Sequence, residues 1–225
     1  AVAPDRLIVG DINFGLVEFD VADPAAPAVV ARHALAGGAS HVVGDADGLW
    51  VANNFAGVTR VAVAPGRPLR QTGRWTVDEA AFALAAADDA VWIVTNEDRL
   101  LAVDPAAETA AHEIGRLDAP GLLVAAAIDA GRTAVVSSWN VDRRSLYVLD
   151  TAPALAPLGG GPLGNLAPFN TPGDAVALAG DVAWVPGGSR GLMAFAVADP
   201  QRPRRLTTPR RGSIPRAEQV DVGAF

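Results

Sequence analysis

One stretch decides the fold of this chain: Gly15-Leu-Val-Glu-Phe-Asp-Val-Ala-Asp-Pro-Ala-Ala-Pro27. Its first half has the composition of a β-strand. Its second half holds two prolines, which end the strand because proline cannot donate a hydrogen bond to a sheet. Weaker copies recur four times, and the hydrophobic anchors of the five copies lie 42, 42, 46 and 46 residues apart, at Phe19, Val61, Val103, Leu149 and Phe195. This spacing predicts one structural unit repeated five times.

Each copy lies among further β-rich segments. A segment rich in Val or Trp precedes it, at residues 6–9, 49–51, 91–94, 133–136 and 182–185. A short strand of small residues comes before that segment, as at 42–43 and 175–178, and a more polar outer strand follows the copy, as at 29–35, 70–77 and 109–117. Four-stranded units of about 40 to 45 residues are typical of β-propeller blades. A β-sandwich is the alternative, but it gives no reason for the regular spacing.

The sequence therefore predicts an all-β fold, a five-bladed β-propeller with four-stranded blades in a single domain over residues 1–225. Blade 1 takes residues 1–37 with 218–225, blade 2 takes 38–78, blade 3 takes 79–118, blade 4 takes 119–168 and blade 5 takes 169–217. Blade 1 lacks an inner strand of its own. The segment Gln219-Val-Asp-Val-Gly-Ala-Phe225 is expected to pair beside residues 6–9, which completes blade 1 and covers exposed strand edges.

The units resemble the LVIVD repeat of bacterial and archaeal β-propellers. That repeat typically reads Gly-Leu-x-Val-Ile-Asp-Val-Ser-x-Pro-x-x-Pro after a hydrophobic strand, and the stretch from Gly15 to Pro27 is a close match. Gly191-Leu-Met-Ala-Phe-Ala-Val-Ala-Asp-Pro-Gln-Arg-Pro203 is another, with Ala196 in place of the usual Asp, and the three middle units match less closely. The resemblance covers nearly the whole chain. It implies a propeller from an often-exported family and supplies no catalytic motif.

Composition excludes several classes of function. A net charge of −7 argues against general nucleic-acid binding, which needs a positive surface. The chain has no cysteine, so disulfides and thiolate chemistry are excluded, and no apolar run reaches the length of a membrane-spanning helix. The chain begins Ala1-Val2-Ala3-Pro4 rather than with methionine. A removed leader and a trimmed chain both explain this start, and an extracytoplasmic location, periplasmic or secreted, is the expectation.

Three motifs that often carry chemistry have simpler explanations here. Gly187-Gly-Ser-Arg-Gly191 matches a nucleophile elbow, but a strand rather than a helix is expected after it, which favours a hairpin turn. Asp45-Ala-Asp-Gly48 resembles the start of a calcium loop, but the later ligands are missing, and Asp-Gly is typical of a hairpin. Gly159-Gly-Gly-Pro-Leu-Gly164 precedes no helix that would bind phosphate, so an outer strand or loop is expected.

The aromatic, histidine and arginine side chains have structural and functional interpretations. Trp50, Trp92 and Trp184 recur on the same strand of three units, which predicts packing between blades. His33 and His112 are expected to be exposed on outer strands. An arginine-rich segment, residues 202–216, is expected to be an extended connection to the closing strand.

A binding face is expected where the loops between second and third strands meet the loops that lead into the inner strands. Amide and carboxylate side chains gather there around the axis of the ring, which is where propellers usually bind ligands. Asn and Asp are also common in turns because they tolerate turn backbones. The candidate ligand-binding residues are His41, Asp11, Asn53, Asn96, Trp139, Asn140, Asp174, Gln219 and Asp221, with Asn13, Asn54 and Ser189 beside them.

The leading hypothesis is a noncatalytic binding or scaffold propeller that uses this face for a protein, a glycan or a small ligand, as a monomer or weak oligomer and without a cofactor. The alternative is a hydrolase or lyase with acidic residues and a divalent cation on the axis. A third hypothesis is a structural module that assembles through the turn of Trp139 or the arginine-rich segment.

Overall fold

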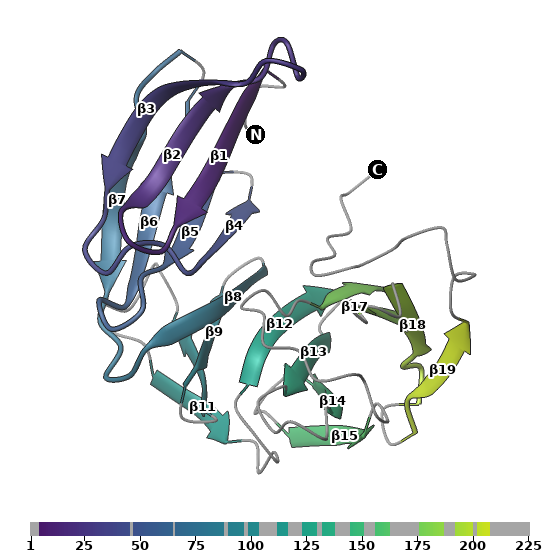
Figure 1. Cartoon of the computed structure of the whole chain (residues 1–225). Coiled ribbons are helices and arrows are strands. Elements are labelled where there is room, and N and C mark those ends of the chain that lie inside the picture. The colour runs from purple at the N-terminus through teal and green to yellow at the C-terminus, as the bar shows by residue number, and fades with distance from the viewer. Residues whose placement is uncertain are drawn as a thin grey trace. The chain divides into compact units, whose positions relative to one another are not determined.

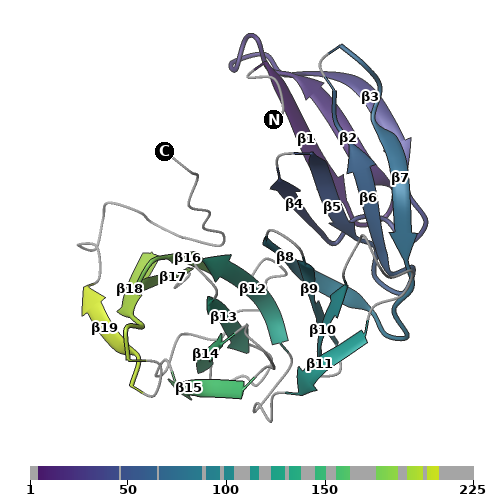
Figure 2. The same cartoon turned by 180° about the vertical axis from the view of Figure 1, so that it is seen from behind.

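The computed structural model of the chain (Figures 1 and 2) describes residues 5–45, 47–64, 66–87, 90–96, 99–103, 112–116, 123–129, 132–137, 145–150, 156–162, 176–186, 192–199 and 202–207. These residues form strands and turns and no helix. The prediction of an all-β fold is therefore confirmed. The predicted closing strand, residues 219–225, lies outside the described residues, as do Trp139, Asn140, Asp174 and Ser189.

Five sheets take their strands in order along the chain. The first has three strands, β1 (Arg6–Asp11), β2 (Gly15–Asp20) and β3 (Ala28–Ala34). The second and third have four each, β4 (His41–Asp45), β5 (Gly48–Ala52), β6 (Val58–Ala62) and β7 (Arg70–Trp75), then β8 (Ala81–Ala87), β9 (Ala90–Thr95), β10 (Arg99–Val103) and β11 (His112–Arg116). The fourth holds β12 (Leu123–Asp129), β13 (Arg132–Ser137), β14 (Ser145–Asp150) and β15 (Ala156–Pro162). The fifth holds β16 (Ala177–Ala179), β17 (Val182–Pro186), β18 (Leu192–Ala196) and β19 (Arg204–Thr207).

A register shift recurs between the third and outer strands of the repeat. In the first, second, fourth and fifth sheets the shift falls just before the hydrophobic anchor, between Glu18 and Phe19, Arg60 and Val61, Val148 and Leu149, and Ala194 and Phe195. A shift of this kind is a β-bulge, which bends the strand and increases its twist. The repeat seen in the sequence is therefore a repeat of structure as well.

The chain divides into two compact units, one of Ala1–Thr95 with Leu101–His112 and the other of Asn96–Leu100 with Glu113–Phe225. In the first unit, the first and second sheets pack face to face (Figures 1 and 2) around Leu16, Leu49, Val51 and Val61. The other face of the second sheet packs on the third through Trp50, Leu84 and Ile93, among others. This arrangement confirms that Trp50 packs between sheets.

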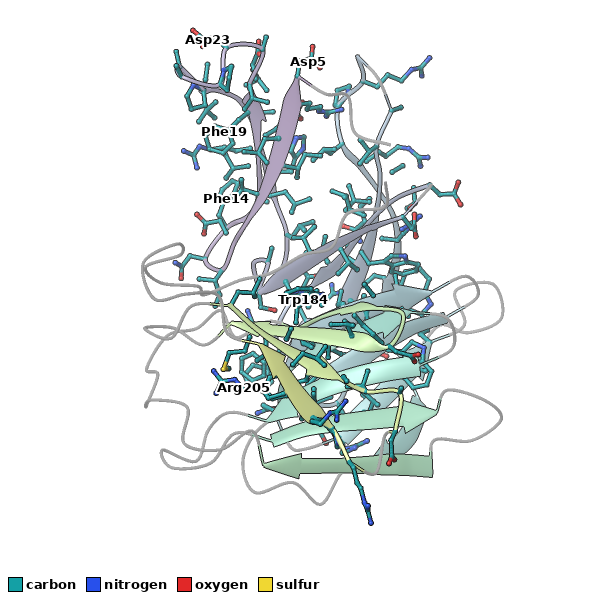
Figure 3. All side chains as sticks on the ribbon, turned by 90° about the vertical axis from the view of Figure 1, so that its right-hand side faces the viewer. Asp5, Phe14, Phe19, Asp23, Trp184 and Arg205 are labelled. Carbon is teal, nitrogen blue, oxygen red and sulfur yellow. The ribbon has the colours of Figure 1, made fainter. Side chains whose placement is uncertain are left out.

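In the second unit, strand β16 of the fifth sheet lies against β12 and β13 of the fourth. Their common core contains Ala125 and Leu146 from the fourth sheet and Val185, Met193 and Phe195 from the fifth. Trp184 occupies the second strand of the fifth sheet (Figure 3) and is half-buried.

Two sequence expectations need correction. The arginine-rich segment is not wholly a connection, because Arg204–Thr207 is the outer strand β19, paired with β18. His33 lies on the outer strand β3, as predicted, but it is half-buried rather than exposed because its ring lies against Glu18. The glycine-rich stretch at residues 159–162 belongs to the outer strand β15, and Asp45 pairs with Gly48 where the hairpin joins β4 to β5.

Candidate functional site

The candidate site in the first unit is built from two turns and one loop. The turns join second to third strands, at residues 11–14 and 53–57, and the loop at residues 37–40 leads into the inner strand β4. We call these three segments the loop platform. Hydrogen bonds tie the loop to both turns, so the expected meeting of the two kinds of loop is observed in this unit.

Asp11 ends β1 and closes the first turn. Its Oδ1 accepts hydrogen bonds from the backbone N–H groups of Asn13 at 2.9 Å and Phe14 at 3.1 Å. Its carbonyl oxygen accepts the N–H of Ala39 at 2.9 Å, which attaches the loop to this turn. A carboxylate that bonds backbone N–H groups two and three residues further on stabilises a turn. Asp11 therefore has a structural task within the platform.

Asn53 holds the loop from the other side. The residue is fully buried, and its Nδ2 donates to the carbonyl oxygen of Gly38. Its Oδ1 has no hydrogen-bond partner among the described residues, and nothing in the structure explains this. The neighbouring Asn54 has a φ of +50° and donates from Nδ2 to the carbonyl oxygen of Gly37 at 2.7 Å. Both asparagines thus fasten the turn to the loop.

The loop fits between the two turns because it contains two glycines. Gly37 and Gly38 have φ angles of +83° and +71°. A Cβ on Gly37 would overlap the carbonyl oxygen of Asn53, and one on Gly38 would overlap that of Ile12. Glycine is required here both by the backbone conformation and by the close approach.

Ser40 and His41 connect the platform to the third sheet. The Ser40 hydroxyl lies 3.1 Å from the carbonyl oxygen of Ala52 and 3.0 Å from that of Ala81, so its one proton is shared between two strands. The backbone N–H of Leu84 donates to Nδ1 of His41 at 3.2 Å. Since Nδ1 accepts, the neutral ring carries its proton on Nε2.

The platform exposes three large apolar side chains as well as the polar side chain of Asn13. Ile12 is 55 % exposed, Phe14 is 38 % exposed and Phe55 is 76 % exposed. Figure 3 shows Phe14 at one end of the first sheet, with Asp5 and Asp23 at the other. These three apolar residues were missed by the sequence reasoning. A signal was present, because a phenylalanine occurs in the second-to-third-strand turn of both of the first two units.

A charged cluster lies at the other end of β5, beside the hairpin turn. Arg60 forms two hydrogen bonds to Asp45, and Trp50 Nε1 donates to Asp45 Oδ2 at 2.8 Å. Burial raises the pKa of Asp45, but the hydrogen bonds from Arg60, from the N–H of Asp47 and from Trp50 outweigh it and hold the pKa below its ordinary value. This carboxylate is occupied by protein donors, as expected of a turn rather than a calcium loop.

A second charged cluster joins the first and second sheets. Arg6 on β1 forms an ion pair through Nε with Glu18 on β2, and it also donates to the carbonyl oxygen of Ala64 at 3.2 Å. His33 Nε2 lies 3.4 Å from Glu18 Oε2. The hydrogen bond from Arg6 is the main reason that the pKa of Glu18 lies below its ordinary value. The cluster is mostly buried and packs sheets together.

The remaining site predictions have mixed outcomes. Asn96 is placed directly after β9. Trp139, Asn140, Asp174, Gln219 and Asp221 lie outside the described residues, so their meeting with Asp11, Asn53 and His41 stays a prediction. Within the part of the chain that the structure describes, no group of three or more His, Asp or Glu residues has an arrangement that would hold a metal ion. The same part contains no helix with the length and apolarity of a membrane span.

Comparison with known proteins bears on the fold alone. No protein-family model matches the chain, and no curated protein matches it. Among solved structures, the whole chain is similar to the crystal structure of the computationally designed Ika8 protein, with a TM-score of 0.66 and 9 % sequence identity. The chain spans 64 % of the length of that protein. In all, 449 chains of solved structures match, so the fold is common and does not indicate a function by itself.

Proposed function

We propose that the chain is a five-bladed β-propeller of the LVIVD-repeat type, closed by its C-terminal strand. The exposure of one face of the first sheet supports this proposal. Leu7 pairs with Phe19, and Leu49 pairs with Val61. Phe19 and Val61 each come directly after the recurrent bulge, so Leu7 and Leu49 occupy equivalent positions in the first and second sheets. Leu49 is 6 % exposed because the first sheet covers it, whereas Leu7 is 48 % exposed. In a closed ring, a preceding blade covers Leu7 as well.

The fifth sheet supports closure from the other end. Trp184 pairs with Ala194, directly before the bulge, as Trp50 pairs with Arg60. The third sheet covers Trp50, whereas Trp184 is half-buried. Leu7 on the first sheet and Trp184 on the fifth are therefore both less buried than their counterparts on the second sheet, Leu49 and Trp50, as expected for the two faces that a ring closure would cover.

The function that we propose is noncatalytic binding or scaffolding, by an exported protein, on the face that carries the second-to-third-strand loops. The loop platform is the observation that carries this proposal. Its turns are fixed by hydrogen bonds from Asp11, Asn53 and Asn54, so a partner meets a surface that is already ordered. Preorganised surfaces lose less entropy on binding. Among the described residues of the platform, the side chains of Asp11, Asn53 and Asn54 bond the protein's own backbone, which is a supporting role.

Melting of the protein with calcium, manganese and zinc ions tests the noncatalytic assignment. A cation at about 100 times its dissociation constant stabilises a protein by about 2.7 kcal/mol, which raises the melting temperature of a chain of this size by about 5 to 10 °C. We expect no cation to produce such a shift. A large shift with one cation, abolished in Asp174→Ala or Asp221→Ala, would instead establish a metal-assisted site on the axis. Asp5→Asn, at an exposed position far from the platform, is the control for a change of net charge.

A further inference from the structure

A histidine side chain links the inner strands of the second and third sheets. His41 lies on β4 and Leu84 lies on β8, and the two strands are side by side (Figures 1 and 2). In the third sheet β8 is the edge strand, and an edge strand has backbone N–H groups without a partner in its own sheet. The backbone N–H of Leu84 donates to Nδ1 of His41 at 3.2 Å. His41 therefore supplies an acceptor from the neighbouring sheet.

The hydrogen bond between Leu84 and His41 is shielded from water. Leu84 is fully buried and His41 is half-buried. Only a neutral imidazole has a ring nitrogen that accepts, because both nitrogens of the protonated ring are donors. Protonation of His41 thus removes the acceptor of the Leu84 N–H. The loss is costly because water does not replace the acceptor of a buried N–H group.

The repeat does not require a histidine at this place. In the third sheet, Ala83 holds the position that His41 holds in the second, since each pairs with the residue two positions after the tryptophan of its unit. Alanine has no side-chain acceptor, so the fold of a unit does not depend on a hydrogen bond from this position. The histidine therefore serves the seam between these two sheets rather than the unit that contains it.

Two other hydrogen bonds across the same seam involve groups that do not titrate near neutral pH. The backbone N–H of Ala81 donates to the carbonyl oxygen of Asn54 at 3.0 Å, and the Ser40 hydroxyl lies 3.0 Å from the carbonyl oxygen of Ala81. These bonds hold the seam whether His41 is neutral or charged. A change at His41 is therefore expected to be local.

The strands that pack against β4 are β1, β5 and β8. Strands β5 and β8 contain no titratable side chain. The charged groups on the other elements around His41 are Arg6 and Asp11 on β1, Asp45 at the far end of β4 and the buried Glu79 just before β8. Arg6 pairs with Glu18, Asp45 bonds Arg60, and Asp11 accepts N–H groups of its own turn.

We propose that His41 makes the junction of the second and third sheets sensitive to pH. At neutral pH the ring accepts the Leu84 N–H and joins β4 to β8. In acid the ring is protonated, this hydrogen bond is lost and the two inner strands separate locally. Since the loop at residues 37–40 leads directly into β4, the change occurs beside the loop platform. This behaviour goes beyond the proposed binding function and does not depend on it.

Hydrogen exchange of the full-length protein, followed by NMR at about pH 7.5 and about pH 5.0, tests the proposal. These conditions lie on either side of the ordinary imidazole pKa of about 6.5. Division of each rate by the intrinsic rate at the same pH gives a protection factor. We expect the protection of the Leu84 amide to fall about tenfold in acid. The Ala81 amide, whose acceptor is a backbone carbonyl, should change by less than about twofold.

Two variants of His41 isolate its titration. His41→Asn keeps an acceptor oxygen near the place of Nδ1 and does not titrate, so the Leu84 amide should be equally protected at both pH values. His41→Ala has the residue found at the equivalent place in the third sheet, and it should leave the Leu84 amide about tenfold less protected than in the parent at about pH 7.5. His33→Asn, a matched change on β3, should retain the loss of protection seen in the parent.

Equal protection of the Leu84 amide at both pH values in the parent would overturn the proposal. The same fall in His41→Asn as in the parent would also overturn it, because acid would then act through another group. A fall that disappears in His33→Asn would assign the effect to the wrong histidine. Parental protection in His41→Ala at about pH 7.5 would show that the ring does not hold the two strands together, and the proposal would fail there too.

Discussion

Arg60 forms hydrogen bonds to both carboxylate oxygens of Asp45, with 2.7 Å from Nη1 to Oδ2 and 2.6 Å from Nη2 to Oδ1. The guanidinium carbon of the same arginine lies 4.6 Å from the centre of the Trp50 ring, and Trp50 in turn lies 5.0 Å from Trp75. One arginine therefore joins the hairpin turn of the second sheet to a pair of aromatic rings. A planar guanidinium is suited to both contacts, and an ammonium group is not.

Replacement of Arg60 by lysine should destabilise the protein although the charge is kept. The two-pronged hydrogen bond and the stacking on Trp50 are both lost, and we expect a decrease of about 1 to 2 kcal/mol in the free energy of unfolding. Urea denaturation followed by tryptophan fluorescence measures it. Arg32→Lys, at an exposed position on β3, is the matched control and should change stability by less than about 0.5 kcal/mol. Equal stability of the two variants would contradict the role given to Arg60.

Glu18 should make the stability of the protein depend on pH. Its pKa is lowered by the ion pair with Arg6, so the stabilisation that it provides is complete above the ordinary glutamate pKa of about 4.3 and is lost as pH falls through the lowered pKa. Glu18→Gln removes this stabilisation and leaves Arg6 without its carboxylate. We expect a loss of about 1 to 3 kcal/mol at pH 7 that shrinks steadily in more acidic solution.

Urea denaturation of the parent and Glu18→Gln over a series of pH values measures this dependence. Asp5→Asn removes an equal charge from an exposed position next to the same sheet (Figure 3) and should show a much smaller difference from the parent. A difference between the parent and Glu18→Gln that stays constant from neutral to acidic pH would show that packing, not the ion pair, is responsible.

Gly38 should be far less tolerant of alanine than Gly66. The two glycines have similar φ angles, +71° and +63°, so the backbone strain of an alanine is similar at both positions. A Cβ on Gly38 would overlap the backbone of Ile12, whereas none of the described atoms lies within 4 Å of a Cβ on Gly66. We expect a cost of about 1 kcal/mol for Gly66→Ala and of about 3 kcal/mol or more for Gly38→Ala.

The difference between these two alanine variants isolates the close approach of the loop to the first turn. Chemical denaturation measures it, and hydrogen exchange of the Ala39 amide, which donates to Asp11, reports whether the loop has separated from the turn. Similar stability of the two variants, with an unchanged exchange rate at Ala39, would mean that the platform adapts to the added methyl group.

The sequence predicts where the strands lie better than it predicts the roles of the polar residues. Alternation, prolines and a regular spacing identify strands such as β5 and β18 because these signals are local. The bulge before Phe19 depends on pairing with β3, so no local signal reveals it. The position of Asp11 and Asn53 in turns predicts a ligand-binding role, but the same side chains bond turn backbones, and only the structure shows where their hydrogen bonds go. The sequence does not single out Phe55, because an apolar residue in a turn does not stand out where half of the residues are hydrophobic.

Removal of residues 219–225 should destabilise the protein strongly if the ring closes as we propose. In the described residues the first sheet has three strands, and β1 lies at its edge. Leu7, on β1, is exposed. Loss of the closing strand would leave that edge unpaired and the apolar face uncovered. We expect a fall in the melting temperature of about 10 °C or more, since each 1 kcal/mol corresponds to about 2 to 4 °C in a chain of this size.

Two point variants separate loss of the strand from loss of chain length. Val222→Pro interrupts hydrogen bonding within the proposed strand and should reproduce much of the effect of the deletion, whereas Ala217→Pro, placed before the strand, should not. A synthetic peptide of residues 218–225, added to the shortened protein, should restore part of the melting temperature in proportion to its concentration. A shortened protein that melts with the parent would refute closure by this segment. Because the platform is held by contacts within the first unit, its hydrogen bonds should persist in the shortened protein.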